Sequence, residues 1–136
     1  MNGKPIKLRL PLKPVPASRP RVPRYGKPYF PKTYSKWRKD AERVVKSYEG
    51  PSINFPVYVN VIFAIPRAKS SKLIVPSGDG DNFEKALYDL LTRKGYLEDD
   101  KWIVRGTWRK RFIPNGQEGY TDVVIIEEWE DIDNDR

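Results

Sequence analysis

The sequence contains neither cysteine nor histidine. The absence of cysteine excludes disulfide bonds and thiolate metal sites, and it suits a cytosolic protein, so we expect a cytoplasmic location. The absence of histidine excludes Ser-His and Cys-His nucleophilic catalysis, as well as zinc sites with histidine ligands. Any metal would therefore have to be bound by oxygen atoms, which favours Mg²⁺ or Mn²⁺.

Long apolar segments are also missing. The sequence has no run of about 20 apolar residues, so we expect no transmembrane helix. The N-terminal stretch MNGKPIKLRLPLKP lacks the apolar core of a signal peptide. The 136 residues, 38% of them hydrophobic and 32% charged, fit one domain over residues 1–136 with a modest core.

Positive charge is abundant but unevenly distributed along the chain, whose net charge is +8. Residues 1–50 carry 14 Lys and Arg against 3 Asp and Glu, whereas residues 127–136 carry 1 against 6. A basic front of this kind indicates a polyanionic partner such as nucleic acid, and the alternative is a basic protein that is merely soluble. We expect the stretch EDIDNDR, residues 130–136, to be frayed, and we assign the acidic tail, residues 127–136, no role.

The hydrophobic pattern predicts an α/β (α+β) domain with a mixed sheet of about four strands and two main helices. A Gly50-Pro51 pair would end the first helix, Gly95 would follow the second, and Asn115-Gly116 predicts a turn between the last two strands. The predicted strands are 6–10, 55–65, 101–112 and 121–129, and the predicted helices are 35–48 and 82–94.

Residues 11–34 form a proline-rich basic loop, because neither a helix nor a central strand tolerates seven prolines at this density. We expect it to be ordered by its aromatic residues, which are Tyr25, Tyr29, Phe30 and Tyr34. Its cations are predicted to contact DNA phosphates, and the alternative is a solvated basic loop. These predicted DNA-binding residues are Arg19, Arg21, Arg24, Lys27 and Lys32.

Carboxylates gather in the segment VPSGDGDNFEKALYDLL, residues 75–91, where the second helix is predicted to begin. Asp81 and Glu84 have the spacing of a capping box with Asp81 as the N-cap, which is a purely structural explanation. Capping does not explain Asp79, nor does it explain the pair Asp99 and Asp100 after the helix.

Three carboxylates near one another raise at least one pKa, and a divalent cation removes that cost. Oxygen ligands together with a phosphate-seeking surface fit Mg²⁺-assisted phosphodiester cleavage. Lys85, one helical turn after Asp81, would either neutralise charge on the scissile phosphate or form an ordinary i, i+4 ion pair.

The stretch DGDNFEKALYDLL…GYLEDDKWI resembles the RusA family of Holliday junction resolvases, whose signature is D-x-D-N-x-x-K-A-x-x-D followed by D-D before a strand. The front segment PVPASRPRVPRYGKPYFPKTYSKW also resembles phage and prophage members. The likeness spans about residues 8–126. Two departures concern the glycines that flank Asp79 and the Lys101 that follows the acidic pair.

The resemblance implies an endonuclease that nicks opposing strands of a four-way junction with Mg²⁺ or Mn²⁺, in DNA recombination, repair or phage DNA processing. It implies a location in the cytoplasm of a bacterial or phage-infected bacterial cell. The metal ligands carry over onto Asp79, Asp81 and Asp100, with Asp99 as the fallback for the third. The essential lysine carries over onto Lys85, so the catalytic set is Asp79, Asp81, Lys85 and Asp100.

The resemblance also implies a homodimer, and one acidic cluster per chain agrees with this, because two symmetric cuts require two sites. The sequence leaves two alternatives open, a nuclease of the same fold that acts on other branched DNA and a non-catalytic DNA-binding protein. Apolar residues of two predicted strands could fill the core and also form the dimer face; they are Val57, Val59, Val61, Phe63, Val123 and Ile125.

Overall fold

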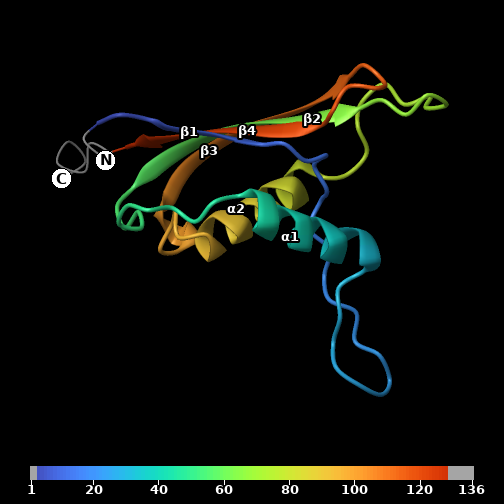
Figure 1. The fold of residues 1–136 in the computed structure, drawn as a ribbon, viewed down its shortest axis with the longest axis horizontal. Coiled ribbons are helices and arrows are strands. Elements are labelled where there is room, and N and C mark those ends of the chain that lie inside the picture. The colour runs from blue at the N-terminus through green and yellow to red at the C-terminus, as the bar shows by residue number, and fades with distance from the viewer. Residues whose placement is uncertain (1–2, 129–136) are drawn as a thin grey trace, which may run out of the picture.

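A four-stranded mixed sheet carries both helices on one of its faces (Figure 1). The computed structural model describes residues 3–128, and its single α+β domain agrees with the predicted fold class. The elements in chain order are β1 (Ile6–Leu10), α1 (Lys32–Val44), β2 (Val57–Pro66), α2 (Gly80–Arg93), the short 3-10 helix η1 (Asp100–Trp102), β3 (Ile103–Ile113) and β4 (Tyr120–Glu127).

The strand order in the sheet is β1-β4-β2-β3. β2 and β3 are parallel and are joined through α2, whereas β4 runs antiparallel to both β1 and β2. The predicted turn at Asn115-Gly116 exists, since Gly116 has a φ of 90°. It does not make a hairpin, however, because β2 lies between the two strands that it connects.

The core lies between the sheet and the two helices. Alternate residues of β2 point into it and meet α2, where the Phe63 and Phe83 rings lie 5.2 Å apart. The six strand residues considered for a dimer face, from Val57 to Ile125, are all buried inside the subunit, at 2% exposure or less. They therefore belong to the core and cannot also contact a partner.

The first helix is displaced from its predicted range, because it begins three residues earlier and ends at Val44. Tertiary hydrogen bonding accounts for the early end: the Tyr48 backbone N–H donates to the Lys94 carbonyl at 2.8 Å. The chain after α1 is therefore held beside the end of α2. As a result, α1 ends six residues before Gly50. Val44, the last residue of α1, is 39% exposed.

The second helix ends as predicted. Gly95 follows the C-cap residue Lys94 and has a φ of 82°, which an L side chain rarely adopts. The Gly95 N–H donates to the Thr92 carbonyl and the Tyr96 N–H to the Leu91 carbonyl, the pair of bonds of a Schellman motif.

The last predicted strand is confirmed as β4, so the first residue of the acidic tail belongs to the sheet. Glu127 belongs to β4, and Glu128 forms an ion pair with Arg105 at 3.0 Å. Residues 129–136 lie outside the described part of the chain. Among the described helices, neither length nor apolar character suffices to cross a membrane.

Candidate active site

α2 begins at a different residue from the predicted one. Its N-cap is Asp79, and Asp81 lies inside the first turn. The Asp79 side chain makes no capping hydrogen bond. The structure thus overturns the interpretation of Asp81 as the cap, and the capping role cannot account for either carboxylate.

Gly80 lets α2 begin close against the sheet. It is buried, and a Cβ atom placed on it would overlap the indole of Trp108 on β3. On the same strand, Lys110 donates from Nζ to the carbonyl of Gly78 at 2.6 Å. Contacts from β3 therefore fix the backbone on both sides of Asp79.

Glu84 does not complete a capping box. It accepts a hydrogen bond from the Tyr88 hydroxyl at 2.5 Å, one turn further along α2. Burial, followed by this hydrogen bond to Glu84, raises the pKa of Tyr88. A Cβ on Gly106 of β3 would lie 3.0 Å from the Tyr88 hydroxyl, so the pair fills the space between helix and strand. Its role is to pack α2 on β3.

Three of the predicted site residues, Asp79, Asp81 and Lys85, are exposed. Their side chains make no hydrogen bond or ion pair with any residue from 3 to 128. The alternative of an ordinary Asp81–Lys85 pair is therefore not realised. Because these charges are exposed and unpaired, they are available to a ligand.

Asp99 and Asp100 lie where η1 begins. The Lys101 backbone N–H donates to Asp99 at 2.8 Å and holds the pKa of that carboxyl below its usual value. Burial, and then the hydrogen bond and charge of Asp99, raise the pKa of Asp100. Together they line a cavity of about 250 Å³ with residues of α2, namely Lys85, Tyr88, Asp89 and Thr92.

The structure brings part of the predicted site together. Lys85 shares the cavity with Asp99 and Asp100, whereas Asp79 and Asp81 do not line it. Asp81 lies one helical turn before Lys85, which puts it on the same side of α2. Within residues 3–128, no three acidic side chains lie close enough together to hold a metal ion.

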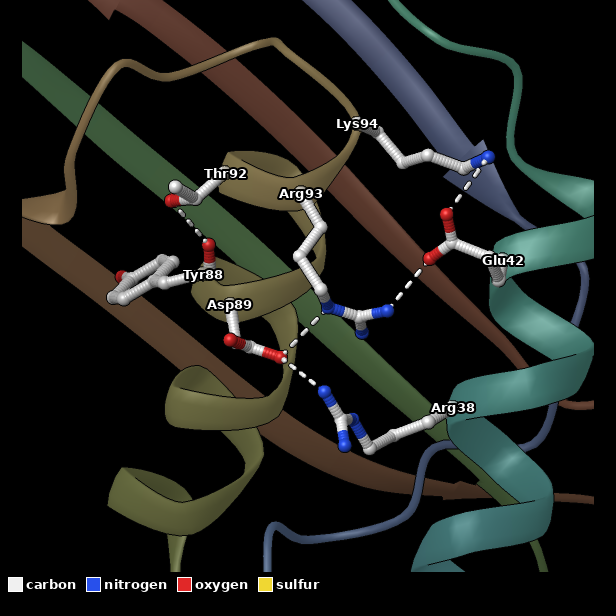
Figure 2. Close-up of polar contacts among 7 residues, drawn as sticks. All are labelled: Arg38, Glu42, Tyr88, Asp89, Thr92, Arg93 and Lys94. Atoms are coloured by element: carbon white, nitrogen blue, oxygen red, sulfur yellow. Dashed lines mark hydrogen bonds and ion pairs between the residues drawn. The ribbon is translucent and has the colours of Figure 1, made fainter.

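The other end of α2 has its charges paired with α1, as Figure 2 shows. Asp89 contacts Arg93 at 3.0 Å and Arg38 of α1 at 3.7 Å. Arg93 also contacts Glu42 at 2.6 Å, and Lys94 contacts the same carboxylate at 3.4 Å. These ion pairs join the two helices.

The basic loop extends from the body as an arm, residues 17–31, which is the blue loop at the bottom of Figure 1. Paired backbone hydrogen bonds between Arg21 and Tyr29, at 2.6 and 2.9 Å, close it into a narrow ribbon. Tyr25 and Tyr29 were expected to pin the arm, but they are 83% and 53% exposed. Backbone pairing closes the arm, while Phe30 at its end packs against the core and edge-on to the buried Tyr34 of α1, with ring centroids 5.1 Å apart.

The five cations predicted to bind DNA are all exposed, and none has an acidic partner in the described chain. The base of the arm adjoins the start of α2, because the Ala17 N–H donates to the Asn82 carbonyl at 2.8 Å. A backbone contact thus joins the arm to the residue after Asp81. This contact has no signature in the sequence.

Several residues that position the site escaped the sequence analysis. Trp108 and Lys110 hold the start of α2, yet neither was singled out, and Gly80 was noted only as a glycine that flanks Asp79. The signal available was the alternation of Gly106, Trp108 and Lys110 along β3, which puts all three on one face. The parallel pairing of β3 with β2 aligns that face with Val59, Val61 and Phe63. Strand pairing between segments so far apart cannot be predicted from the spacing of residues in the sequence.

An α+β domain that carries an unpaired basic arm beside unpaired carboxylates has the features of a protein that binds and processes nucleic acid. The comparison with protein families identifies which kind. Residues 11–124 match the family Endodeoxyribonuclease RusA, so the chain belongs to this family. No curated protein matches the chain.

Membership of this family indicates the activity of the chain. RusA proteins are Holliday junction endodeoxyribonucleases, so the chain is a hydrolytic nuclease of DNA recombination whose substrate is branched DNA. The non-catalytic alternative is therefore wrong. The metal, the residues that bind it and the oligomeric state are matters of proposal.

Proposed function

We propose that the chain resolves four-way junctions by paired symmetric nicks, with Mg²⁺ or Mn²⁺ bound by Asp79, Asp81 and Asp100. Asp99 is the alternative third ligand. The proposal is supported chiefly by the closeness of two groups of unpaired charges. The cationic arm is hydrogen-bonded, through Ala17, to the turn of α2 that bears the carboxylates. DNA held by the arm would lie beside them.

The donor atoms suit a hard divalent cation. All the acidic groups offer oxygen, and the chain has no cysteine or histidine. Within residues 3–128, no Lys or Arg pairs with Asp79 or Asp81. Since no three carboxylates converge within the described chain, Asp79, Asp81 and Asp100 would have to come closer together to bind one ion. A bound cation would activate water and stabilise charge on the transferring phosphate.

Lys85 is the cation best situated to assist. Its exposed amine lacks a partner in the described residues and shares the cavity with Asp99 and Asp100. Within that cavity it would neutralise charge on the scissile phosphate or on the leaving oxygen. The arm and the first residue of α1 would bind the DNA backbone, through Arg19, Arg21, Arg24, Lys27 and Lys32.

Two symmetric cuts require two such sites, so we propose a homodimer with one cut made by each subunit. Mixing wild-type subunits with an excess of Asp81→Asn subunits tests this on a plasmid that extrudes a cruciform. Heterodimers would nick one strand, and the product would shift from linear DNA to nicked circles. Full resolution by a protein that light scattering finds monomeric would contradict the dimer.

Cleavage of a synthetic four-way junction with Mg²⁺, compared with duplex and flap substrates and with EDTA, tests the activity itself. The proposal predicts paired nicks in the junction that depend on the metal. Preferred cleavage of the flap would instead favour a RusA-fold nuclease for other branched DNA. Cleavage that persists in EDTA would remove the metal from the proposal.

A further inference from the structure

The loop between β2 and α2 exposes three consecutive aliphatic residues that the proposed function does not use. Leu73 is 51% exposed, Ile74 89% and Val75 60%. This apolar tip, residues 73–75, belongs to the yellow-green loop that projects beyond the sheet in Figure 1. Scattered exposed aliphatics are common, but three in succession on a projecting loop indicate a contact surface.

The loop is braced at both ends. The Arg67 guanidinium lies over the Phe112 ring at 4.1 Å and donates to the Leu73 carbonyl at 2.5 Å. Asn115 donates to the Arg67 carbonyl at 3.0 Å, while at the other end Lys110 donates to the Gly78 carbonyl. The tip is therefore presented on a supported loop.

The charges around the tip indicate its partner. Lys69 and Lys72 are exposed and have no acidic partner in the described chain, and residues 66–78 contain no acid. An apolar tip preceded by two cations complements a surface with an apolar centre and an anionic edge. Stacked bases flanked by phosphates form such a surface, but only where a base step is open.

We infer that the apolar tip inserts between base pairs at the branch point and holds it open, with Ile74 as the inserted side chain. Aliphatic residues act as wedges of this kind in other DNA-bending proteins. Asp79 lies five residues after Ile74, a span of at most about 17 Å. The inference rests on the proposed junction substrate, and it gives the chain a means to distinguish a branch point from intact duplex.

A junction that carries 2-aminopurine beside the branch point tests the insertion, because unstacking of this base raises its fluorescence. We expect wild-type protein in EDTA to raise the fluorescence of the junction and not of a matched duplex. Ile74→Ser should remove most of the rise and lower the preference for junction over duplex about tenfold. Ile74→Phe should retain both, and Val44→Ser, at an exposed aliphatic residue of α1, should change neither.

Two outcomes would overturn the insertion. One is an unchanged fluorescence rise and an unchanged preference in Ile74→Ser. The other is a loss of self-association in that variant by light scattering with no loss of fluorescence, because the tip would then contact a second copy. A wild-type protein that gives the fluorescence rise but cuts no junction with Mg²⁺ would contradict only the proposed function. Thermal melting verifies that each variant is folded.

Discussion

The carboxylates at the start of α2 and those nearer its end differ in whether they have ion-pair partners. At the start of the helix, Asp79 and Asp81 are exposed and have no partner in residues 3–128. Nearer the end, Asp89 is also exposed, yet it contacts two arginines, Arg93 and Arg38. All three residues are aspartates of one sequence motif, so residue type alone does not separate them.

This difference in partners indicates that the three aspartates have different roles. Asp89 connects α1 to α2, and its charge is neutralised by groups of the fold. The charges of Asp79 and Asp81 are left unbalanced beside the anchored base of the arm. A chain with 26 Lys and Arg could have paired them, and the absence of a pair in the described structure is what makes them candidates for ligand binding.

The strongest test of this comparison is Asp81→Asn, with Asp79→Asn beside it. Each substitution keeps the size of the side chain and removes a charged ligand, so we expect cleavage to fall by about 100-fold or more while junction binding is retained or strengthened. Single-turnover cleavage and gel-shift binding measure the two effects. Wild-type rates in both variants would refute the assignment of the metal ligands.

A second test disturbs the backbone that carries these carboxylates. In Gly80→Ala the new methyl group would overlap Trp108, and we expect a loss of about 1–3 kcal/mol of stability together with reduced cleavage. Denaturant unfolding measures the first effect. Replacing Trp108 by Ala in the same chain should relieve the overlap, and no recovery in the double variant would contradict the proposed packing.

A third test concerns the arm. Replacing Arg19 and Arg21 by Ala should weaken binding to every DNA sequence and lower the log–log dependence on salt by nearly two units, because two phosphate contacts are lost. Binding titrations at several salt concentrations give this slope. An unchanged slope would put the DNA path elsewhere, and Lys46→Ala, at an exposed lysine of the body, provides the control.

The smallest effect is expected at the paired end of the helix. Asp89→Asn removes exposed ion pairs at the edge of the Lys85 cavity, so we expect less than about 1 kcal/mol of destabilisation and a much smaller loss of cleavage than in Asp81→Asn. Denaturant unfolding and the same cleavage assay measure both. A loss of cleavage as large as that of Asp81→Asn would remove the distinction between the two ends of α2.

The elements of the fold were predictable because their signals are local. The apolar period of α2 and the Gly95 stop predicted that helix closely, and the β-branched run predicted β2. The end of α1 was not predictable, since it depends on a hydrogen bond from Tyr48 to Lys94. The strand order was not predictable for the same reason, because only long-range pairing places β2 between β3 and β4.

The candidate site was predictable in composition and less so in arrangement. The motif identified Asp79, Asp81, Lys85 and the Asp99-Asp100 pair as candidates, and the family match agrees with the motif. The sequence misassigned the N-cap, because Asp79 and Asp81 are both good capping residues and the contact of Gly80 with Trp108 determines where the helix begins. Whether an aspartate of the motif has an ion-pair partner depends on α1, which lies far away in the sequence.

The bond between the Ala17 N–H and the Asn82 carbonyl has a consequence for sequence change. Both atoms belong to the main chain, so nineteen of the twenty residue types can supply the donor and every type can supply the acceptor. This bond therefore places almost no constraint on the residue type at position 17, while the arm keeps its register against α2. Proline at position 17 is the one replacement that removes the donor, and with it this register.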